Sequence, residues 1–190
     1  MKKTALLFGI LLAVFLMHQR ADAYLELSAF YSGDNFNLGS SSSTSRTQLQ
    51  GSLGFAVDRK AHFLIGWNYA WHTIAEEASS VSTSYSSTQM GPRLLWFFTR
   101  SKAWSLGLTY NLVTKAQYKA GSGPSEEWSG TAYKVDLGHN FALGESAFVG
   151  LRLNYLSVTY TSKLVGGSYS DISHTITSMY PAVFFVYVWE

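Results

Sequence analysis

The sequence of 190 residues contains no cysteine, little proline and little charge. Without cysteine it can form no disulfide framework, no thiolate zinc site and no lipid-modified cysteine. Three prolines against sixteen glycines argue against a proline-rich linker protein. Charged residues make up only 14% of the chain, well below the ~25% of an ordinary soluble domain. The aromatic content of 16% argues against disorder.

The first 23 residues have the organisation of a targeting segment. Lys2 and Lys3 form a basic start, residues 4–17 are almost entirely apolar, and Ala21-Asp22-Ala23 supplies a small-x-small cleavage site. The apolar run is shorter than the ~20 residues that a helix needs to cross a bilayer. We therefore predict that residues 1–23 are a cleaved signal peptide and that 24–190 form the mature domain; a retained anchor is the alternative.

The mature chain is electrically balanced. Residues 24–190 carry eleven Lys or Arg and eleven Asp or Glu, so the net charge of +2 belongs to the segment that is removed. Proteins that bind nucleic acid need a basic surface to meet the phosphates. The sequence therefore predicts no nucleic-acid partner.

Large apolar residues alternate with small or polar residues along most of the mature chain, which is the period of β-strands. The clearest segment places Phe63, Ile65, Trp67, Tyr69 and Trp71 on one face. The eight segments of this kind span 25–31, 48–57, 62–72, 89–98, 104–112, 133–138, 149–155 and 174–189. The last segment is apolar on both faces, so its pattern does not reveal which face meets lipid and which faces the lumen.

The connections between these segments alternate in length. Short ones are expected at 58–60, 99–102 and 143–146, and longer ones rich in Ser, Thr and Gly at 32–45, 73–87, 119–127 and 161–173. An even number of strands with alternating short and long connections is typical of an up-and-down antiparallel barrel.

The composition of the two strand faces favours a membrane barrel over a soluble sheet. One face carries Trp, Tyr, Leu and Ile, and the other carries Gly, Ser, Asn, Gln and a few charges, whereas a soluble sheet would expose more Lys and Glu. A closed barrel also pairs all backbone groups within the bilayer. The alternative is a secreted sandwich or lipocalin-like barrel. Aromatic residues near the strand ends are expected to form girdles at the two membrane interfaces: Phe55, Phe63, Trp96, Phe98, Trp104 and Phe141 near short turns, and Tyr31, Trp71, Tyr85, Tyr118, Trp128 and Tyr160 near long ones.

With its signal peptide, eight alternating strands and aromatic-rich last strand, the sequence resembles the small outer-membrane β-barrels of Gram-negative bacteria. These include the OmpA transmembrane domain, the OmpX and NspA type and opacity-like adhesins. The resemblance implies short periplasmic turns, longer extracellular loops and contact with the bilayer and lipopolysaccharide. Residues 183–189 resemble the terminal strand that the barrel assembly machinery reads, although the chain ends in Trp189-Glu190 where Phe is usual. Closure removes the free sheet edges through which chains associate, so a monomer is expected.

Five charged residues fall on the small, polar face of the strands: Glu26, Arg93, Lys134, Asp136 and Arg152. The interior of an eight-stranded barrel is just wide enough to be filled by side chains. Charges in so narrow a space must pair, since an isolated buried charge costs several kcal/mol. We predict a polar plug that closes the lumen; a gate with exchanging partners is the alternative.

Catalytic and metal-binding patterns are weak. His72 precedes Glu76-Glu77, and His174 lies near Asp171 and Ser173, so each histidine has the partners of an acyl-transfer site. Ser is so common in these segments that its proximity to a histidine carries little weight, and we predict no enzyme.

The other titratable residues give no closely spaced ligand set, because His62 and His139 fall at the end of the barrel opposite His72 and His174. We expect no metal site and no cofactor, although the pairs Glu76-Glu77 and Glu126-Glu127 could bind divalent cations. The predicted function is a structural or surface-interaction role carried by the extracellular loops. The alternatives are a lipid A-modifying enzyme and a narrow channel or conduit for small hydrophobic molecules.

Overall fold

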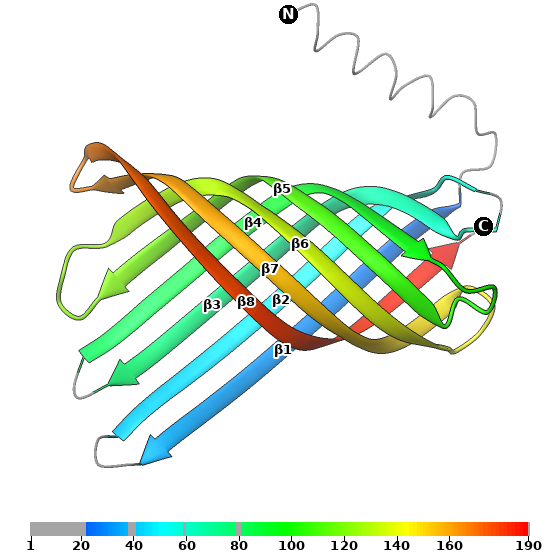
Figure 1. Ribbon diagram of the computed structural model, residues 1–190, viewed down its shortest axis with the longest axis horizontal. Helices are drawn as coiled ribbons and strands as arrows, with labels where there is room; N and C mark the ends of the chain where they lie inside the picture. Colours follow the sequence, from blue (N-terminus) through cyan, green and yellow to red (C-terminus); the bar gives the residue numbers. More distant parts are fainter. Residues whose placement is uncertain (1–21, 38–40, 59, 79–80, 190) are drawn as a thin grey trace, which may run out of the picture.

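The computed structural model describes residues 22–37, 41–58, 60–78 and 81–189, and it confirms the eight-stranded fold. The strands form one closed antiparallel barrel in which each strand pairs with the next along the chain and β8 returns to β1 (Figure 1). They are β1 (Ala23–Asn37), β2 (Ser41–Ala56), β3 (Phe63–Ala78), β4 (Val81–Phe97), β5 (Trp104–Ala120), β6 (Glu126–Ala142), β7 (Ala147–Val165) and β8 (Ser168–Trp189). No helix in this part of the chain is long and apolar enough to cross a membrane. Residues 1–21 of the predicted signal peptide lie outside the described residues.

The alternation read from the sequence matches the two faces of the barrel wall. In β3, for example, Phe63, Ile65 and Trp67 are exposed on the outer surface, while Leu64 and Asn68 are buried in the lumen. The structure also resolves the register of β8. Residues Val183, Tyr187 and Trp189 face outward, and the even-numbered residues between them face the lumen.

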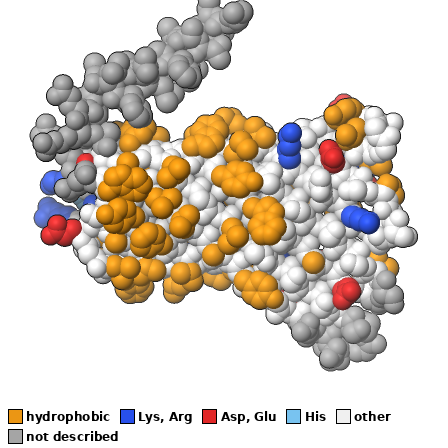
Figure 2. Space-filling view, turned by 180° about the vertical axis from the view of Figure 1, so that it is seen from behind, with side chains coloured by type: hydrophobic (Ala, Val, Ile, Leu, Met, Phe, Trp, Pro, Cys, Tyr) orange, Lys and Arg blue, Asp and Glu red, His pale blue; other side chains and the backbone are white. Residues whose placement is uncertain are grey.

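Hydrophobic side chains form a belt around the outside of the barrel. Figure 2 shows them gathered over the middle and one end of the wall, with charged side chains at the two extremities of the molecule. We call the end that holds the connections 57–62, 98–103 and 143–146 the inner end, and the opposite one the outer end. All six aromatics predicted for the inner girdle lie on the outer surface, exposed or half-buried. The belt has the distribution that a lipid-facing barrel requires.

The predicted outer girdle is only partly correct. Tyr31 and Trp71 face outward, but Tyr85 and Tyr160 are buried in the lumen, and Tyr118 and Trp128 pack against the same interior cluster. The prediction was wrong for these four because it assumed that every large aromatic faces lipid. At the outer end of the barrel, aromatic residues instead fill the interior.

The segments predicted as long outer loops are mostly strand. β1 extends to Asn37, and β2 begins at Ser41. β7 and β8 are joined by a turn of two residues, Gly166 and Gly167. Both glycines have positive φ, 56° and 87°, as a tight two-residue hairpin turn requires. The sequence pattern missed these extensions because Ser and Thr occupy both faces there, so hydrophobic alternation disappears although the backbone pairing continues.

The connection 57–62 at the inner end is held by side-chain and backbone hydrogen bonds. The Phe63 N–H donates to the Asp58 carboxylate at 2.7 Å, and the Ala61 N–H donates to the Asp58 carbonyl at 3.0 Å. Partial burial raises the pKa of Asp58. The hydrogen bonds that its carboxylate accepts from backbone N–H groups outweigh this effect and lower the pKa below its ordinary value. These bonds fix the turn between β2 and β3.

A charge placed in the hydrophobic belt should destabilise the barrel in lipid. We expect Leu153→Arg, in the middle of β7, to lower the free energy of unfolding by about 2–4 kcal/mol, the usual cost of a cation on the lipid face at mid-depth. Thr161→Arg, an exposed position farther along the same strand, should change it by less than ~1 kcal/mol. Urea unfolding in phospholipid vesicles measures both. Equal effects would contradict the assignment of the belt.

Candidate functional site: the barrel lumen

The lumen is filled by three successive layers of side chains. At the inner end lies an apolar layer, which we call the inner apolar layer; it contains Tyr24, Leu64, Leu95, Phe97, Phe148, Phe184, Val186 and Val188, with Ala56 and Ala61. The middle holds the five predicted charged residues, which we call the charged layer. Toward the outer end follows a mixed aromatic and aliphatic cluster, which we call the outer cluster; it contains Tyr85, Ala116, Ala132, Leu156, Val158, Tyr160 and Tyr180.

All five charged residues predicted from the sequence are buried in the lumen. Arg93 and Arg152 are the two largest side chains with less than 2% exposure. Glu26 comes from β1, Arg93 from β4, Asp136 from β6 and Arg152 from β7, so the charged layer joins opposite walls of the barrel.

Arg93 lies between the two carboxylates and binds each with two nitrogens. Its Nε and Nη2 donate to Glu26 at 2.8 and 2.9 Å, and its Nη1 and Nη2 donate to Asp136 at 2.8 and 3.2 Å. Nη1 also donates to the Thr109 hydroxyl at 2.8 Å. Bidentate arginine–carboxylate pairs are among the strongest charge-assisted hydrogen bonds, and their planar geometry fixes both partners.

Arg152 completes a ring of ion pairs with the same two carboxylates. Its Nη1 donates to Glu26, and its Nε lies 2.9 Å from Asp136 Oδ1. Lys134 lies 3.6 Å from Asp136 and donates to the side-chain oxygen of Gln50. The three cations and two anions therefore share one network, whose ion pairs offset part of the desolvation that burial imposes.

The packing around the charged layer depends on residues without a side chain. Gly107 on β5 pairs with Asp136 on β6, and a Cβ at Gly107 would lie 2.3 Å from the Asp136 carboxylate. Gly150 on β7 makes room for the Phe184 ring in the same way, because a Cβ at Gly150 would lie 2.8 Å from that ring. Phe184 in turn packs under the Arg152 guanidinium, 3.9 Å from its centre, a cation–π contact between the charged and inner apolar layers.

The outer cluster is held by aromatic contacts and one buried hydrogen bond. The Tyr85 and Tyr160 hydroxyl groups are hydrogen-bonded to each other across the lumen. Trp128 packs on Tyr160 with ring centroids 5.3 Å apart, and Phe30 packs on Tyr180 at the same centroid distance. This cluster narrows the lumen above the charged layer.

The two histidines considered for catalysis occupy different environments. His72 is buried in the lumen with its ring edge-on to Tyr85, while Glu76 and Glu77 are exposed farther along the strand. His174 is exposed and packs its ring against Trp128. Among the described residues, neither histidine forms an ion pair with a carboxylate. Nor does a group of three His, Cys, Asp or Glu capable of holding a metal occur in those ranges.

Comparison with solved structures identifies the architecture. The chain is similar to Neisserial surface protein A (TM-score 0.57, 13% identity, covering 87% of this chain and 96% of that one). It is also similar to OprG of Pseudomonas aeruginosa (TM-score 0.47, 11% identity, covering 91% of this chain and 98% of that one). A further similar structure is the translocator domain of the autotransporter NalP of Neisseria meningitidis (TM-score 0.42, 12% identity, covering 96% of this chain and 68% of that one). The chain has the fold of a small outer-membrane β-barrel. No protein-family model and no curated protein matches the sequence.

Sequence reasoning identified the charged layer but missed the apolar layer beneath it. Leu64, Leu95 and Phe97 lie on the face that also carries Asn68 and Arg93, so the alternation contained the signal. That face was interpreted as polar along its whole length. The hydrophobic residues that share a face with Asn68 and Arg93 near the short turns could have revealed the inner apolar layer.

Breaking the ion-pair ring at its centre should strongly destabilise the barrel. Arg93→Met leaves Glu26 and Asp136 short of a partner, and removal of one member of a buried pair typically costs about 3–5 kcal/mol. Arg100→Met, in an exposed inner turn, should cost less than ~0.5 kcal/mol. Unfolding by urea in vesicles compares the two variants. A cost for Arg93→Met no larger than that of the control would contradict the network.

Filling the space beside Asp136 should also destabilise the barrel. Gly107→Ala forces the Asp136 carboxylate to move away from its arginines, and we expect a loss of about 1–3 kcal/mol, as for other overpacked interiors. Gly144→Ala is the matched control because nothing lies within 4 Å of the added Cβ. Thermal loss of the folded band on electrophoresis measures both variants. A neutral Gly107→Ala would mean that the packing is looser than the contacts indicate.

Proposed function

We propose that this protein is a non-enzymatic, non-conducting barrel of the outer membrane of a Gram-negative bacterium, with a structural or surface-interaction role carried by its outer hairpins. The observation that carries the proposal is the ion-pair ring of Glu26, Arg93, Asp136 and Arg152, joined across the lumen between two largely apolar layers. A pathway for ions or metabolites would have to break this ring and displace Phe184 and Phe97 below it.

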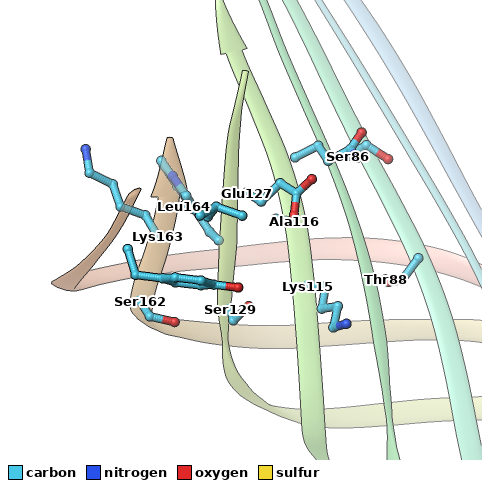
Figure 3. A pocket seen from close by; sticks show the side chains of 12 residues that line it. Ser86, Thr88, Lys115, Ala116, Glu127, Ser129, Ser162, Lys163 and Leu164 are labelled. Atoms are coloured by element: carbon cyan, nitrogen blue, oxygen red, sulfur yellow. The ribbon is translucent and has the colours of Figure 1, made fainter. Parts of the chain in front are cut away.

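The outer hairpins offer a polar surface suited to recognition. A groove of about 400 Å³ runs over β4 to β8 (Figure 3). It is lined by hydroxyl groups, two lysines and one carboxylate: Ser86, Thr88, Ser129, Ser162, Tyr169, Lys115, Lys163 and Glu127, among others. Lys163 lies 3.8 Å from Glu126, while Lys115 is exposed. Hydroxyls and tyrosine make adaptable contacts at binding surfaces, and lysines above a lipid belt are placed to meet anionic head groups.

The remaining elements of the proposal follow from the architecture. The hydrophobic belt contacts the bilayer, and lysines at its outer edge contact lipopolysaccharide. The barrel assembly machinery reads β8, whose outward face carries Val183, Tyr187 and Trp189. The protein acts as a monomer and needs no cofactor, metal or nucleic acid. Among the described residues, neither His72 nor His174 is paired with the carboxylate that would orient an acyl-transfer base.

Electrical recording tests closure of the lumen. We expect the purified protein in planar bilayers to give no reproducible conductance steps. The charge-balanced variant Glu26→Ala/Arg93→Ala/Phe97→Ala/Phe184→Ala removes one anion and one cation of the ring together with the two aromatic rings below it, and it should raise conductance. Steps in the unaltered protein as large as those in the variant would overturn the proposal of a closed lumen.

Lipid analysis tests the absence of enzyme activity. Mass spectra of lipid A from cells lacking the gene and from cells overproducing the protein should be identical. A gain or loss of an acyl chain that follows the amount of protein would contradict the proposal. His72→Ala and His174→Ala would then show which histidine the reaction needs.

A further inference from the structure

The barrel is closed unevenly, because the β1–β8 seam is much shorter than the others. Within the described ranges, seven residue pairs join β1 to β8, from Ala23↔Trp189 to Ala29↔Val183. Every other pair of neighbouring strands is joined by at least thirteen residue pairs. Beyond Ala29 the two strands diverge toward the outer end, as Figure 1 shows, although each remains paired on its other side.

The seam ends inside the hydrophobic belt. Seven residues at ~3.3 Å each span about 23 Å along the strand, and a strand tilt of about 40° reduces this to about 18 Å across the membrane. The apolar belt of an outer-membrane barrel is about 25 Å tall. With the first seam pair, Ala23↔Trp189, taken as the inner edge of the belt, the gap between β1 and β8 begins about 7 Å below its outer edge, where lipid chains surround the wall.

Proline explains why the ladder stops where it does. Pro181 lies in β8 two residues before Val183, the last residue paired with β1, and a proline has no N–H to donate to a neighbouring strand. Only a few backbone groups of each edge lie at hydrocarbon depth. The rest lie in the head-group layer, where water and lipid oxygens can pair with them, so the gap is compatible with the bilayer.

An apolar groove leads to the gap from the lipid side. It has a volume of about 600 Å³ and contains the last seam pair, Ala29 and Val183. Its walls are formed by larger apolar side chains on both sides of the seam: Leu27, Leu49, Tyr69, Trp71, Val149 and Phe185. Its small floor residue Ala29 lets a chain-like ligand approach the backbone at the point where the strands separate.

On the lumen side, the gap faces the outer cluster. Phe30 of β1 and Tyr180 of β8 face inward just beyond the last seam pair, and the centroids of their rings lie 5.3 Å apart. Behind them lie Leu156, Val158 and Tyr160, all almost completely buried. Rotation of two aromatic side chains, without loss of any strand pairing, would connect the external groove with this apolar interior.

We propose that the gap between β1 and β8 admits an acyl chain of a surrounding membrane lipid, which runs from the external groove past Phe30 and Tyr180 into the outer cluster. The occupant is a lipid chain because the groove lies in the lipid-facing belt and the cluster behind the gap is largely hydrophobic, the polar side-chain atoms of its buried members being the hydroxyls of Tyr85, Tyr160 and Tyr180. The charged layer below limits how deeply the chain penetrates. This lateral site goes beyond the proposed function, and it coexists with a lumen closed to ions.

Photo-labelling of the unaltered protein tests the site. The protein is placed in nanodiscs of phosphatidylcholine in which a fraction of the lipid carries a diazirine at the end of one acyl chain. After illumination, adducts are mapped by mass spectrometry. We expect adducts on lumen-facing residues, chiefly Leu156, Val158 and Tyr180, in addition to those on the belt. Adducts confined to outward-facing residues would overturn the proposal.

A covalent cross-link across the gap, the staple, tests whether lumenal labelling depends on the gap being open. Tyr31 and Met179 flank the gap and are 71% and 68% exposed, and the chain has no cysteine of its own, so Tyr31→Cys/Met179→Cys can be bridged with a bis-maleimide. The staple should reduce lumenal adducts several-fold, whereas the same reagent on Tyr110→Cys/Tyr133→Cys, a pair within the complete β5–β6 seam, should not. Equal lumenal labelling in the two stapled proteins would overturn the proposal. The unbridged double-cysteine proteins show whether the substitutions themselves alter folding or labelling.

Discussion

The architecture of this barrel depends on the neutralisation of charge inside a narrow lumen. An eight-stranded wall leaves room for side chains and little water, so each buried charge needs a partner of opposite sign within hydrogen-bond reach. Arg93 meets this condition by binding Glu26 and Asp136 at once, and Arg152 closes the ring from the other side. Strands β1, β4, β6 and β7 are thereby held at one register.

The surrounding residues can be understood as consequences of this ring. Gly107 is small because Asp136 occupies the space next to it, and Phe184 lies flat under Arg152 because a guanidinium stacks favourably on an aromatic face. The inner apolar layer and the outer cluster then exclude water from both sides, which strengthens the ion pairs between them. Outside, the hydrophobic belt satisfies the opposite requirement, contact with lipid.

The sequence predicted the parts of the structure that follow from strict alternation. The eight strands, the closed barrel and all five residues of the charged layer were predicted because a charge on an otherwise small, polar face can only point inward. The interior aromatics Tyr85 and Tyr160 were placed wrongly, since residue size alone does not distinguish lipid from a packed lumen. The extended hairpins were missed because Ser and Thr pair well in strands without giving a hydrophobic period. The partners within the ring depend on register and strand tilt, which a single sequence does not reveal.

In this molecule the lumen is closed by side chains although the backbone pairing of the wall is incomplete between β1 and β8. The charged layer lies where the wall is continuous, and the short β1–β8 seam leaves a gap only beside the outer cluster. A double-mutant cycle on Glu26→Gln and Arg93→Met, measured as free energies of unfolding in vesicles, tests the central role of the ring most directly. We predict a coupling energy of about 2–3 kcal/mol, the upper range for residues in direct contact. Additive effects, within ~0.5 kcal/mol, would contradict the view that the lumen is organised by this network.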